Sequence, residues 1–505
     1  MRQIAKMGNP MNNNRELAAF EPKEVFRYFY DICSIPHGSG NTGAIAKYCL
    51  DFAGRHGYEA VQDAAGNVIL YAGASRGYEH CRPVALQGHL DMVCDKAADC
   101  GKDMEQEGVE PVVRGNYLAA EGTTLGADDG IGIAYILAIL SMEVPHPPIE
   151  AVFTVDEEIG MLGAGALDFS KIQSKRLINI DSEEEGILTV SCAGGVRAEC
   201  SVKIRRQERE DRVCHSDFRV NVHGLPGGHS GVEIHKKIPN AIKVLAAFLQ
   251  LLEEDIPFQI LDITGGVRDN SIPKQACALL RTEGVQPRRF REKLEKAAER
   301  IRKIYKNSPG LAVDFETAGE NGTGADTDRL CPIHPQDGRR IIDFLRQAPD
   351  GIIEMSREIP DMVESSLNLG VCRTGDSCFT MNYLIRSNAA SGKEMLCNQL
   401  SECAGGFGGT VAFFADYPAW EFRKESPLLR HMVRAYEEEY GKKPVISGIH
   451  AGLECGIFYG RKPELDMVSF GPTLLHVHTP EEKMELGSVL RTWNYLLKIL
   501  LNMKD

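Results

Sequence analysis

The sequence predicts an α/β fold with a mostly parallel central sheet and helices on both faces, plus an inserted α+β domain. Helix and strand patterns alternate through the first two hundred residues, which is typical of a parallel sheet. The pattern changes near residue 204 and resumes after about residue 412. At 505 residues the chain is also longer than one hydrophobic core usually serves. We therefore expect a first domain built from residues 1–203 and 413–505, interrupted by a second domain at 204–412.

The first part of the chain contains helical apolar spacing and short apolar strands. Helices are predicted in three stretches, EPKEVFRYFYDICSIP, NTGAIAKYCLDFAGRHG and GIGIAYILAILSM. Strands are predicted in four, NVILYAG, PVALQGHLDMV, IEAVFTV and RLINID. In a parallel sheet the functional crevice lies beyond the carboxyl ends of the strands. The His and acidic residues that follow these strands should therefore meet there: His89, Asp91, Glu157, Glu158 and Asp181.

The middle of the chain has a different character. FRVNVHGLPGGHSG reads as a strand that enters a glycine-rich turn, and FTMNYLIRS reads as a further strand. Helices are expected in PNAIKVLAAFLQLLEE and in the charged, amphipathic REKLEKAAERIRKIYK. PLLRHMVRAYEEEYGKKP and ELDMVSFGP then resume the α/β pattern.

Composition excludes several classes of protein. Hydrophobic residues make up 43% and charged residues 25%, which is ordinary for a globular chain. The net charge of −14 disfavours a nucleic-acid binder, because phosphate contacts need clustered Lys and Arg. We find no run of eighteen apolar residues, no secretory signal and no CxxC pair among the fifteen cysteines. These features predict a cytoplasmic protein with reduced thiols, without membrane or nucleic-acid partners.

Five short stretches combine His, Asp and Glu in strand or loop settings. They are GHLD (His89, Asp91), TTLGADDGIG (Asp128, Asp129), TVDEEIG (Glu157, Glu158), NIDSEEEG (Asp181) and GPTLLHVHTPEE (His476, His478). Zinc accepts imidazole nitrogen and carboxylate oxygen, and a catalytic site keeps a position open for water. Two His and three carboxylates suffice for two metals that share one carboxylate, an arrangement that supports peptide and ester hydrolysis.

Each stretch also has a simpler interpretation. An HxD pair is often a structural ion pair, and DEE after a strand is usually solvated acid. The glycines around Asp128 could serve only a tight turn. Five such motifs at strand ends of one α/β core are difficult to assemble by accident, so the combination favours a metal site.

In this order the motifs resemble the M20 metallopeptidases, and within them the cytosolic Xaa-His (aminoacyl-histidine) dipeptidases. The resemblance covers nearly the whole chain and includes CAGG, GLPGGHSGVEIH, SSLNLG, IHAGLECGIF and FGPTLLHVHTPEE. It implies a zinc-peptidase-like catalytic domain and an inserted lid or dimerisation domain. It also implies a homodimer with two Zn²⁺ per subunit, although Mn²⁺ or Co²⁺ would suit the same ligands.

The resemblance assigns roles to individual residues. The implied metal ligands are His89, Asp128, Glu158, Asp181 and His478, with Asp128 as the bridge between the two metals. Glu157 matches the general base that takes the proton of the attacking water. Asp91 would hold the second nitrogen of the His89 imidazole. His476 does not match a ligand and is expected to be a neighbour or a core residue.

The inserted domain contributes three further candidates. GGHSG is not a serine hydrolase elbow, because Val232 stands where glycine would be required. By resemblance, His229 reaches a neighbouring active site, often across a dimer, and helps to hold the oxyanion. The simpler alternative is a turn histidine that caps the following helix. Asn270 and Arg386 sit where related enzymes contact the substrate carboxylate, which an arginine fork suits.

The predicted function is metal-dependent hydrolysis of small dipeptides, Xaa-His and other unblocked ones. An N-acyl amino acid hydrolase of the same fold remains an alternative, although SSLNLG and HAGLECG favour the dipeptidase branch. An inactive peptide-binding relative is the second alternative. Against it, none of the five expected metal ligands is substituted, and the expected general base is also present. The translation start could be Met1, Met7 or Met11.

Overall fold

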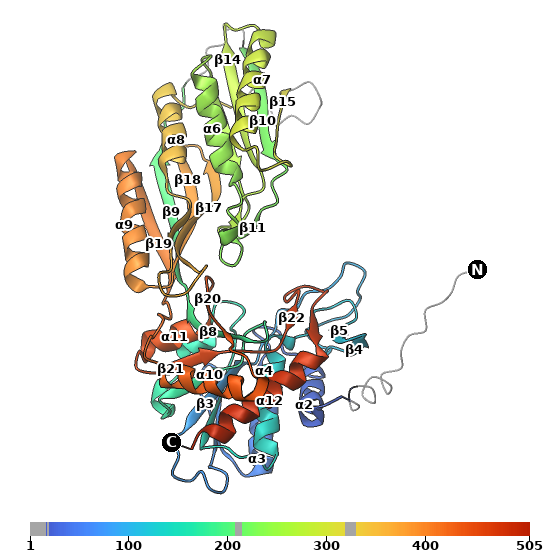
Figure 1. Ribbon diagram of the computed structural model, residues 1–505. Helices are drawn as coiled ribbons and strands as arrows, with labels where there is room; N and C mark the ends of the chain where they lie inside the picture. Colours follow the sequence, from blue (N-terminus) through green and yellow to red (C-terminus); the bar gives the residue numbers. More distant parts are fainter. Residues whose placement is uncertain (1–16, 18–19, 208–214, 319–329, 505) are drawn as a thin grey trace, which may run out of the picture. The chain divides into compact units, whose positions relative to one another are not determined.

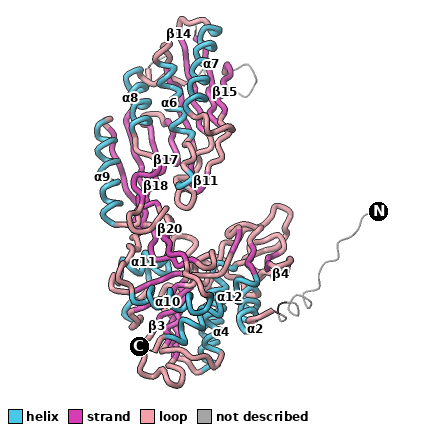
Figure 2. The backbone as a smooth tube through the Cα atoms, viewed as in Figure 1, coloured by secondary structure: helices cyan, strands magenta, loops and turns pink. Residues whose placement is uncertain are grey.

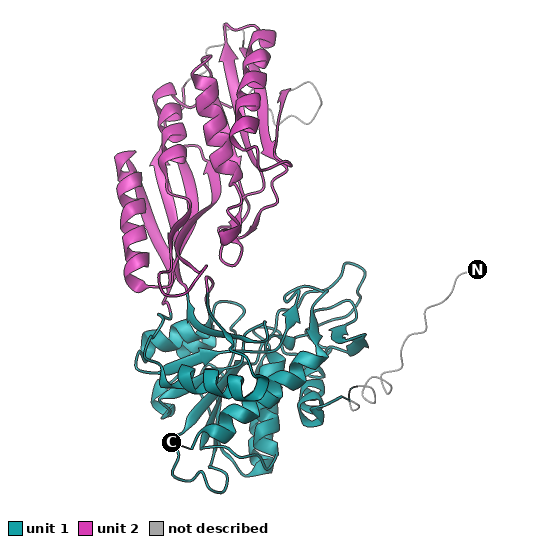
Figure 3. Ribbon diagram, viewed as in Figure 1, with its two compact units in different colours: residues 1–192, 420–448, 453–505 teal, residues 193–419, 449–452 magenta. Residues whose placement is uncertain are grey.

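The structure is a computed structural model that describes residues 17, 20–207, 215–318 and 330–504. The three candidate start methionines therefore lie outside the described residues. The chain separates into two compact units (Figure 3). Unit 1 comprises Met1–Cys192, Trp420–Gly448 and Leu453–Asp505, and unit 2 comprises Ala193–Ala419 and Ile449–Gly452.

The unit boundaries differ from the predicted 203/204 and 412/413. The first falls at 192/193, because strand β9 (Gly194–Lys203) pairs with strands of unit 2. The second falls at 419/420, because β19 (Gly409–Tyr417) is also part of that sheet. The local pattern of apolar residues cannot show to which sheet a strand belongs, because strand pairing depends on residues that are far apart in the sequence.

Unit 1 contains an eight-stranded sheet in the order β1-β2-β6-β3-β7-β21-β8-β20 (Figure 1). Its strands are β1 (Glu59–Gln62), β2 (Val68–Ala72), β3 (Val84–His89), β6 (Ile149–Thr154), β7 (Arg176–Asn179), β8 (Ile187–Cys192), β20 (Val445–Ile449) and β21 (Asp466–Ser469). The four central strands, β6, β3, β7 and β21, run parallel, whereas β1 and β2 on one side and β8 on the other pair antiparallel. The parallel centre brings the carboxyl ends of β3, β6 and β7 to one edge.

Helices surround this sheet. They are α2 (Lys23–Cys33), α3 (Gly43–His56), α4 (Ala127–Ser141), α5 (Leu162–Ala166), α10 (Pro427–Tyr440), α11 (Glu454–Arg461) and α12 (Leu486–Asn502), with a 3₁₀ turn η1 at Phe169–Lys171. Helix α4 is apolar on all sides and almost wholly buried, as a helix in the middle of a core must be. Helix α12 is amphipathic and buries one face.

A small sheet that the sequence did not predict completes unit 1. It joins β22 (Leu474–Leu475), β23 (Lys483–Glu485), β5 (Tyr117–Ala120) and β4 (Pro111–Arg114). The loop between β22 and β23 carries His478. Strands of two to four residues are too short to give a clear period-two signal, which is why this sheet was missed.

Unit 2 is built on an antiparallel sheet of long strands (Figure 2), as expected for an α+β domain. The path β15-β10-β14-β12-β17-β18-β9-β19 contains β9 and β19 with β10 (His215–His223), β12 (Gln259–Gly265), β14 (Ala276–Glu283), β15 (Ala312–Thr317), β17 (Val363–Thr374) and β18 (Cys378–Ser387), and β16 (Gly351–Met355) pairs with β17. A separate pair joins β11 (Gly228–His229) to β13 (Ser271–Ile272). The helices are α6 (Ala241–Glu253), α7 (Pro287–Ile304), α8 (Pro335–Gln347) and α9 (Ala390–Gly406), with a 3₁₀ turn η2 at Ile234–Lys236. These helices and the sheet share one apolar core.

Two further observations bear on the predicted environment of the protein. Within the described parts of the chain, the structure contains no helix with both the length and the apolarity that a membrane crossing requires. The fourteen cysteines among the described residues are all free thiols.

Candidate metal centre

The predicted ligands are brought together at the carboxyl edge of the unit 1 sheet. His89 is the last residue of β3, and Asp181 follows β7 by two residues. Glu158 lies on the turn after β6, and Asp128 lies in the first turn of α4. His478 reaches the group from the loop between β22 and β23.

The ligand atoms of these side chains lie within contact of one another. His89 Nε2 is 3.1 Å from Asp128 Oδ1 and 3.5 Å from Asp181 Oδ1. His478 Nε2 is 3.1 Å from Asp128 Oδ2 and 3.0 Å from Glu158 Oε1. Asp128 therefore contacts one imidazole with each of its oxygens, which is the position a bridging carboxylate would occupy.

Asp129 is a further acid in this cluster that was not predicted to have a role. One potential ligand group contains His89, Asp128 and Glu158, and another contains His89, Asp129 and Asp181. The Asp129 carboxylate already accepts a hydrogen bond from the main-chain N–H of His89 at 3.1 Å. A Cβ at Gly88 would lie 2.2 Å from Asp129 Oδ2, so glycine is required there for close approach. The Asp128–Asp129 peptide bond is cis.

Glu482 holds the loop that leads into Asp128. Its buried carboxylate accepts hydrogen bonds from the main-chain N–H groups of Leu125 (2.8 Å), Gly126 (3.2 Å) and Ala127 (2.8 Å). Glu482 follows His478 by four residues, so one loop supplies both a candidate ligand and the support of another. The sequence shows Glu482 only as the second acid of HTPEE, and nothing in its pattern marked it.

Asp91 contacts the imidazole of His89 differently from the expectation. His89 Nδ1 is 2.9 Å from the main-chain oxygen of Asp91, whereas the Asp91 carboxylate is 3.6 Å away. The carboxylate instead accepts hydrogen bonds from Glu157 N (2.9 Å), Glu158 N (3.2 Å) and Ser39 Oγ (2.8 Å). Asp91 thus orients His89 through its main chain and the Glu157–Glu158 turn through its side chain.

The pKa values of both imidazoles and of two acids in the cluster lie above their ordinary values. Hydrogen bonds with Asp128 and Glu158 raise the pKa of His478 to about 11. Burial opposes the charge on His89, yet its hydrogen bonds with Asp128 and Asp181 hold its pKa well above the ordinary value. Burial raises the pKa of Asp181 to about 6 and that of Glu157 well above its usual range.

These residues fit a site for divalent cations. Two imidazoles and three carboxylates point their ligand atoms at each other within 3.0–3.5 Å, although the buried acids repel one another as anions. A cation would replace the protons that otherwise hold the group together, and nitrogen and oxygen ligands suit zinc, manganese or cobalt.

Three candidates lie in unit 2. His229 Nδ1 accepts hydrogen bonds from the main-chain N–H groups of Gly231 (3.2 Å) and Val232 (3.3 Å), which leaves the ring proton on Nε2. Burial, together with the charge of Arg386, lowers the pKa of His229. His229 is therefore a neutral imidazole with an Nε2–H donor, and its Nδ1 is bonded to the turn that follows it.

The other two unit 2 candidates have different surroundings. Arg386 is buried and donates to Tyr417 Oη at 2.9 Å, while its Nε–H has no hydrogen-bond partner among the described residues. Asn270 lies in the loop before β13, and its main-chain oxygen accepts from Ser230 N at 2.9 Å. Asn270 is thus tied to the segment that carries His229.

His450, from the IHAGLECG stretch, is a buried residue of unit 2 that received no predicted role. Its Nε2 is 2.8 Å from Ser366 Oγ, and its Nδ1 is 3.1 Å from Asn388 Oδ1. Burial, together with the charge of Arg386, lowers its pKa to about 3. Its buried, hydrogen-bonded position could not be read from one sequence.

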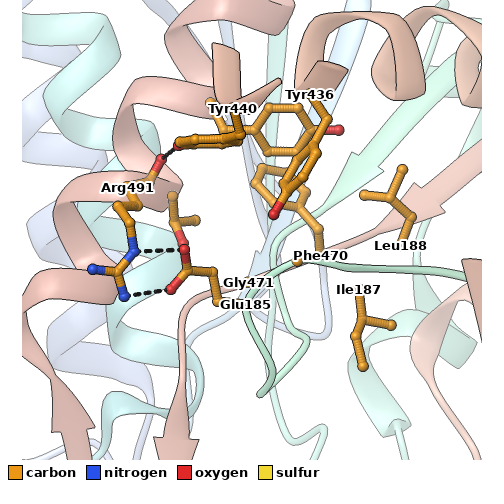
Figure 4. Close-up of a pocket in the computed structure, with 11 residues that line it drawn as sticks. Glu185, Ile187, Leu188, Tyr436, Tyr440, Phe470, Gly471 and Arg491 are labelled. Atoms are coloured by element: carbon orange, nitrogen blue, oxygen red, sulfur yellow. Dashed lines mark hydrogen bonds and ion pairs between the residues drawn. The ribbon is translucent and has the colours of Figure 1, made fainter. Parts of the chain in front are cut away.

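Two neighbouring features are structural. Glu185, which follows Asp181 in NIDSEEEG, forms a two-pronged ion pair with Arg491 of α12 at 2.7 Å (Figure 4). The last of the three consecutive glutamates, Glu185, therefore anchors the segment after Asp181. His476 is exposed, so the expectation that it could be a core residue is wrong.

Known proteins resemble this chain over almost its whole length. The chain is 36% identical over 487 residues to the cytosol non-specific dipeptidase of Escherichia coli K12, an alignment that covers 96% of this chain and 98% of the relative. The crystal structure of the aminoacylhistidine dipeptidase from Vibrio alginolyticus matches with a TM-score of 0.85 and 34% identity, covering 96% of this chain and 97% of that one. Aminopeptidase PepT from Bacillus cereus shares the fold at 15% identity, with a TM-score of 0.53, over 96% of this chain and all of that one.

A family model provides the assignment. Residues 85–502, which include all the candidate ligands, match the model of peptidase family M20/M25/M40. This match confirms the predicted M20 resemblance, and the structural likeness confirms the predicted α/β fold with an inserted second domain. The chain belongs to peptidase family M20/M25/M40.

Proposed function

We propose that this protein hydrolyses dipeptides that have a free amino terminus, using water activated at a pair of divalent metal ions in unit 1. The observation that carries the proposal is the cluster of His89, Asp128, Glu158, Asp181 and His478 at the carboxyl edge of the sheet. The two relatives described above that share more than 30% identity with almost the whole chain bear the names of dipeptidases.

The five ligands divide into two sets that share Asp128. His89 and Asp181 would hold one ion, and Glu158 and His478 would hold the other. Two such ions, Zn²⁺ by preference, would polarise the scissile carbonyl and lower the pKa of water toward neutrality.

Glu157 is the proposed general base. Its main-chain N–H is fixed by the Asp91 carboxylate at 2.9 Å, and Asp156 before it has the left-handed φ of 55°. Burial raises the pKa of Glu157, so it can accept the proton of the attacking water and return one to the departing amine.

The proposed substrate contacts come from residues of unit 2. The Nε2–H of His229 would donate to the oxyanion that develops on the scissile carbonyl. The guanidinium of Arg386 and the amide of Asn270 would contact the carboxylate of the substrate.

A substrate panel tests this function. Purified protein of measured metal content, with Zn²⁺ or Mn²⁺ restored, should release amino acids from Xaa-His and other dipeptides and none from N-acetyl amino acids. Cleavage of N-acetyl amino acids alone would favour the N-acyl amino acid hydrolase. Failure to hydrolyse any dipeptide by metal-loaded protein would favour a peptide-binding relative.

We also propose a homodimer that forms through unit 2. Strand β19 ends the strand order of its sheet, and Phe413 and Phe414 on it are 41% and 47% exposed. An edge strand with exposed aromatic side chains is suited to pairing with a second copy. Sedimentation should give twice the chain mass for the wild type and a monomer for Phe413→Lys/Phe414→Lys, whereas the exposed Val267→Lys control should stay dimeric. A monomeric wild type would refute this assembly.

A cytoplasmic location is the accompanying proposal. The free thiols of the described residues suit a reducing compartment, and the relative from Escherichia coli is named a cytosol enzyme. Fractionation of the native host, with the protein in the soluble fraction, tests it.

A further inference from the structure

A second layer of polar side chains is buried beneath the candidate ligands in unit 1. Gln87 of β3, Thr154 of β6, Asn179 of β7 and Glu454 of α11 are all fully buried. Gln87 Nε2 donates to Glu454 Oε2 at 2.6 Å, and Thr154 Oγ1 donates to the same oxygen at 2.7 Å. Asn179 Nδ2 donates to Gln87 Oε1 at 2.6 Å. The four side chains form one connected network.

The network lies one step below the metal cluster. Side chains two residues apart on a strand point to the same face, so Gln87 lies beneath His89 at a separation of about 7 Å. Asn179 precedes Asp181 by two residues, and Thr154 pairs with His89 across β3 and β6. Glu454, the first residue of α11, completes the network and lies 300 residues after Thr154 in the sequence.

This layer departs from what the core of a parallel sheet usually contains. Strands that are buried on both faces are normally rich in Val, Ile and Leu, because an unpaired buried polar group costs about 1–3 kcal/mol. Here Glu454 Oε1 and Asn179 Oδ1 are buried without a hydrogen-bond partner in the described structure. Core packing alone therefore does not explain why a carboxylate stands at this position.

We propose that Glu454 is a positioning residue for the metal centre, which holds the carboxyl ends of β3 and β6 in register beneath His89. Its two hydrogen bonds bridge the strand that ends in His89 and the strand that leads to Glu157 and Glu158. A shift of either strand end would change the distances among the ligands. This inference rests on the proposed metal-dependent function.

Metal affinity tests the role without relying on catalysis. In Glu454→Gln the shape is kept, but Gln87 Nε2 and Thr154 Oγ1, which share Oε2, would meet a weaker amide acceptor in place of a carboxyl oxygen. The apo protein, titrated with Zn²⁺ against a chromogenic chelator, should bind metal about 10–100-fold more weakly than the wild type, the usual effect of removing a support of a metal ligand. The visible spectrum of the Co²⁺-loaded variant should also change.

Glu150→Gln is the matched control. Glu150 is a buried acid on the same strand, β6, and it accepts hydrogen bonds from the main-chain N–H groups of Gln173 (2.8 Å) and Ser174 (3.0 Å). This control removes a buried charge from the opposite end of the strand, so its metal affinity should equal that of the wild type. Thr154→Val provides a second variant if Glu454→Gln does not fold, and it should weaken metal binding at least threefold.

The outcomes separate this inference from the proposed function. Weaker metal binding by Glu454→Gln or Thr154→Val, with unchanged binding by Glu150→Gln, supports the positioning role. Wild-type affinity in both network variants would overturn it while the metal-dependent function stands. Equal weakening in Glu150→Gln would also overturn it, because the effect would then follow from lost stability. A wild-type protein that binds no metal would refute both.

Discussion

The support of Asp128 by Glu482 can be tested with a single change of charge. In Glu482→Gln the side chain keeps its size, but one carboxylate oxygen becomes an NH₂ group that cannot accept a hydrogen bond. The carboxylate now accepts from three main-chain N–H groups, two on Oε2 and one on Oε1. The variant must therefore leave at least one buried N–H without its partner.

The structure gives the size of the expected effect. Glu482 is 2% exposed, so water cannot replace the lost acceptor. A buried donor left unsatisfied costs about 1–3 kcal/mol, which should lower the Tm of unit 1 by roughly 2–8 °C. Because Asp128 directly follows Ala127, displacement of this loop should also weaken metal binding by about 10–100-fold.

Thermal unfolding and chelator competition measure the two effects. Glu481→Gln is the matched control, because Glu481 is the exposed neighbour in the same loop and undergoes the same change of charge. The control should match the wild type in both assays. If Glu482→Gln behaves like Glu481→Gln, the hydrogen bonds of Glu482 do not support the metal centre and the reasoning fails.

Three further predictions concern the chemistry and the pH dependence. The Glu157→Gln variant should keep its bound metal but lose about 10²–10⁴-fold in turnover, whereas the His478→Ala variant should lose bound metal. Equal metal loss in both variants would contradict the assignment of Glu157 as the base and of His478 as a metal ligand. His229→Ala should lower turnover by about 10²–10³-fold with little change in bound metal, and unchanged turnover would refute its role as an oxyanion donor. His450 has a pKa of about 3 when folded and an ordinary value of 6.5 when unfolded, so the unfolded chain binds the additional proton between these values. Unit 2 should therefore lose stability as the pH falls from 6.5 toward 3, by at most about 1.4 kcal/mol per pH unit. His450→Gln should flatten this pH dependence of the free energy of unfolding. The control His235→Gln changes an exposed histidine and should leave the pH dependence unchanged.

Much of the fold follows from local pattern. The buried strands and helices of the α/β part lie where apolar runs and helical spacing predict them, for example β3 (Val84–His89) and α4 (Ala127–Ser141). The small sheet that contains β22 and β23 was missed, and the unit boundary lies at 192/193 instead of 203/204. Both depend on which strands pair, and pairing joins segments that are far apart in the chain.

The candidate site divides in the same way. Residue type and strand-end position were sufficient to bring His89 and Asp181 into the candidate site, because side chains after parallel strands converge wherever the sheet forms, whereas His478 was selected by the family resemblance. The supports were not accessible from the sequence: Glu482 reaches Ala127 across 355 residues, and Glu454 reaches Gln87 across 367.

The sequence by itself therefore determined the fold class, the family resemblance and the set of acids and imidazoles that could bind metal. Only the tertiary structure decided which side chains hold that set in place, and it assigned the carboxylate of Asp91 to the Glu157–Glu158 turn. The physical reason is that chemistry at a strand end is encoded locally, whereas burial and hydrogen-bond partners arise only when distant segments pack together.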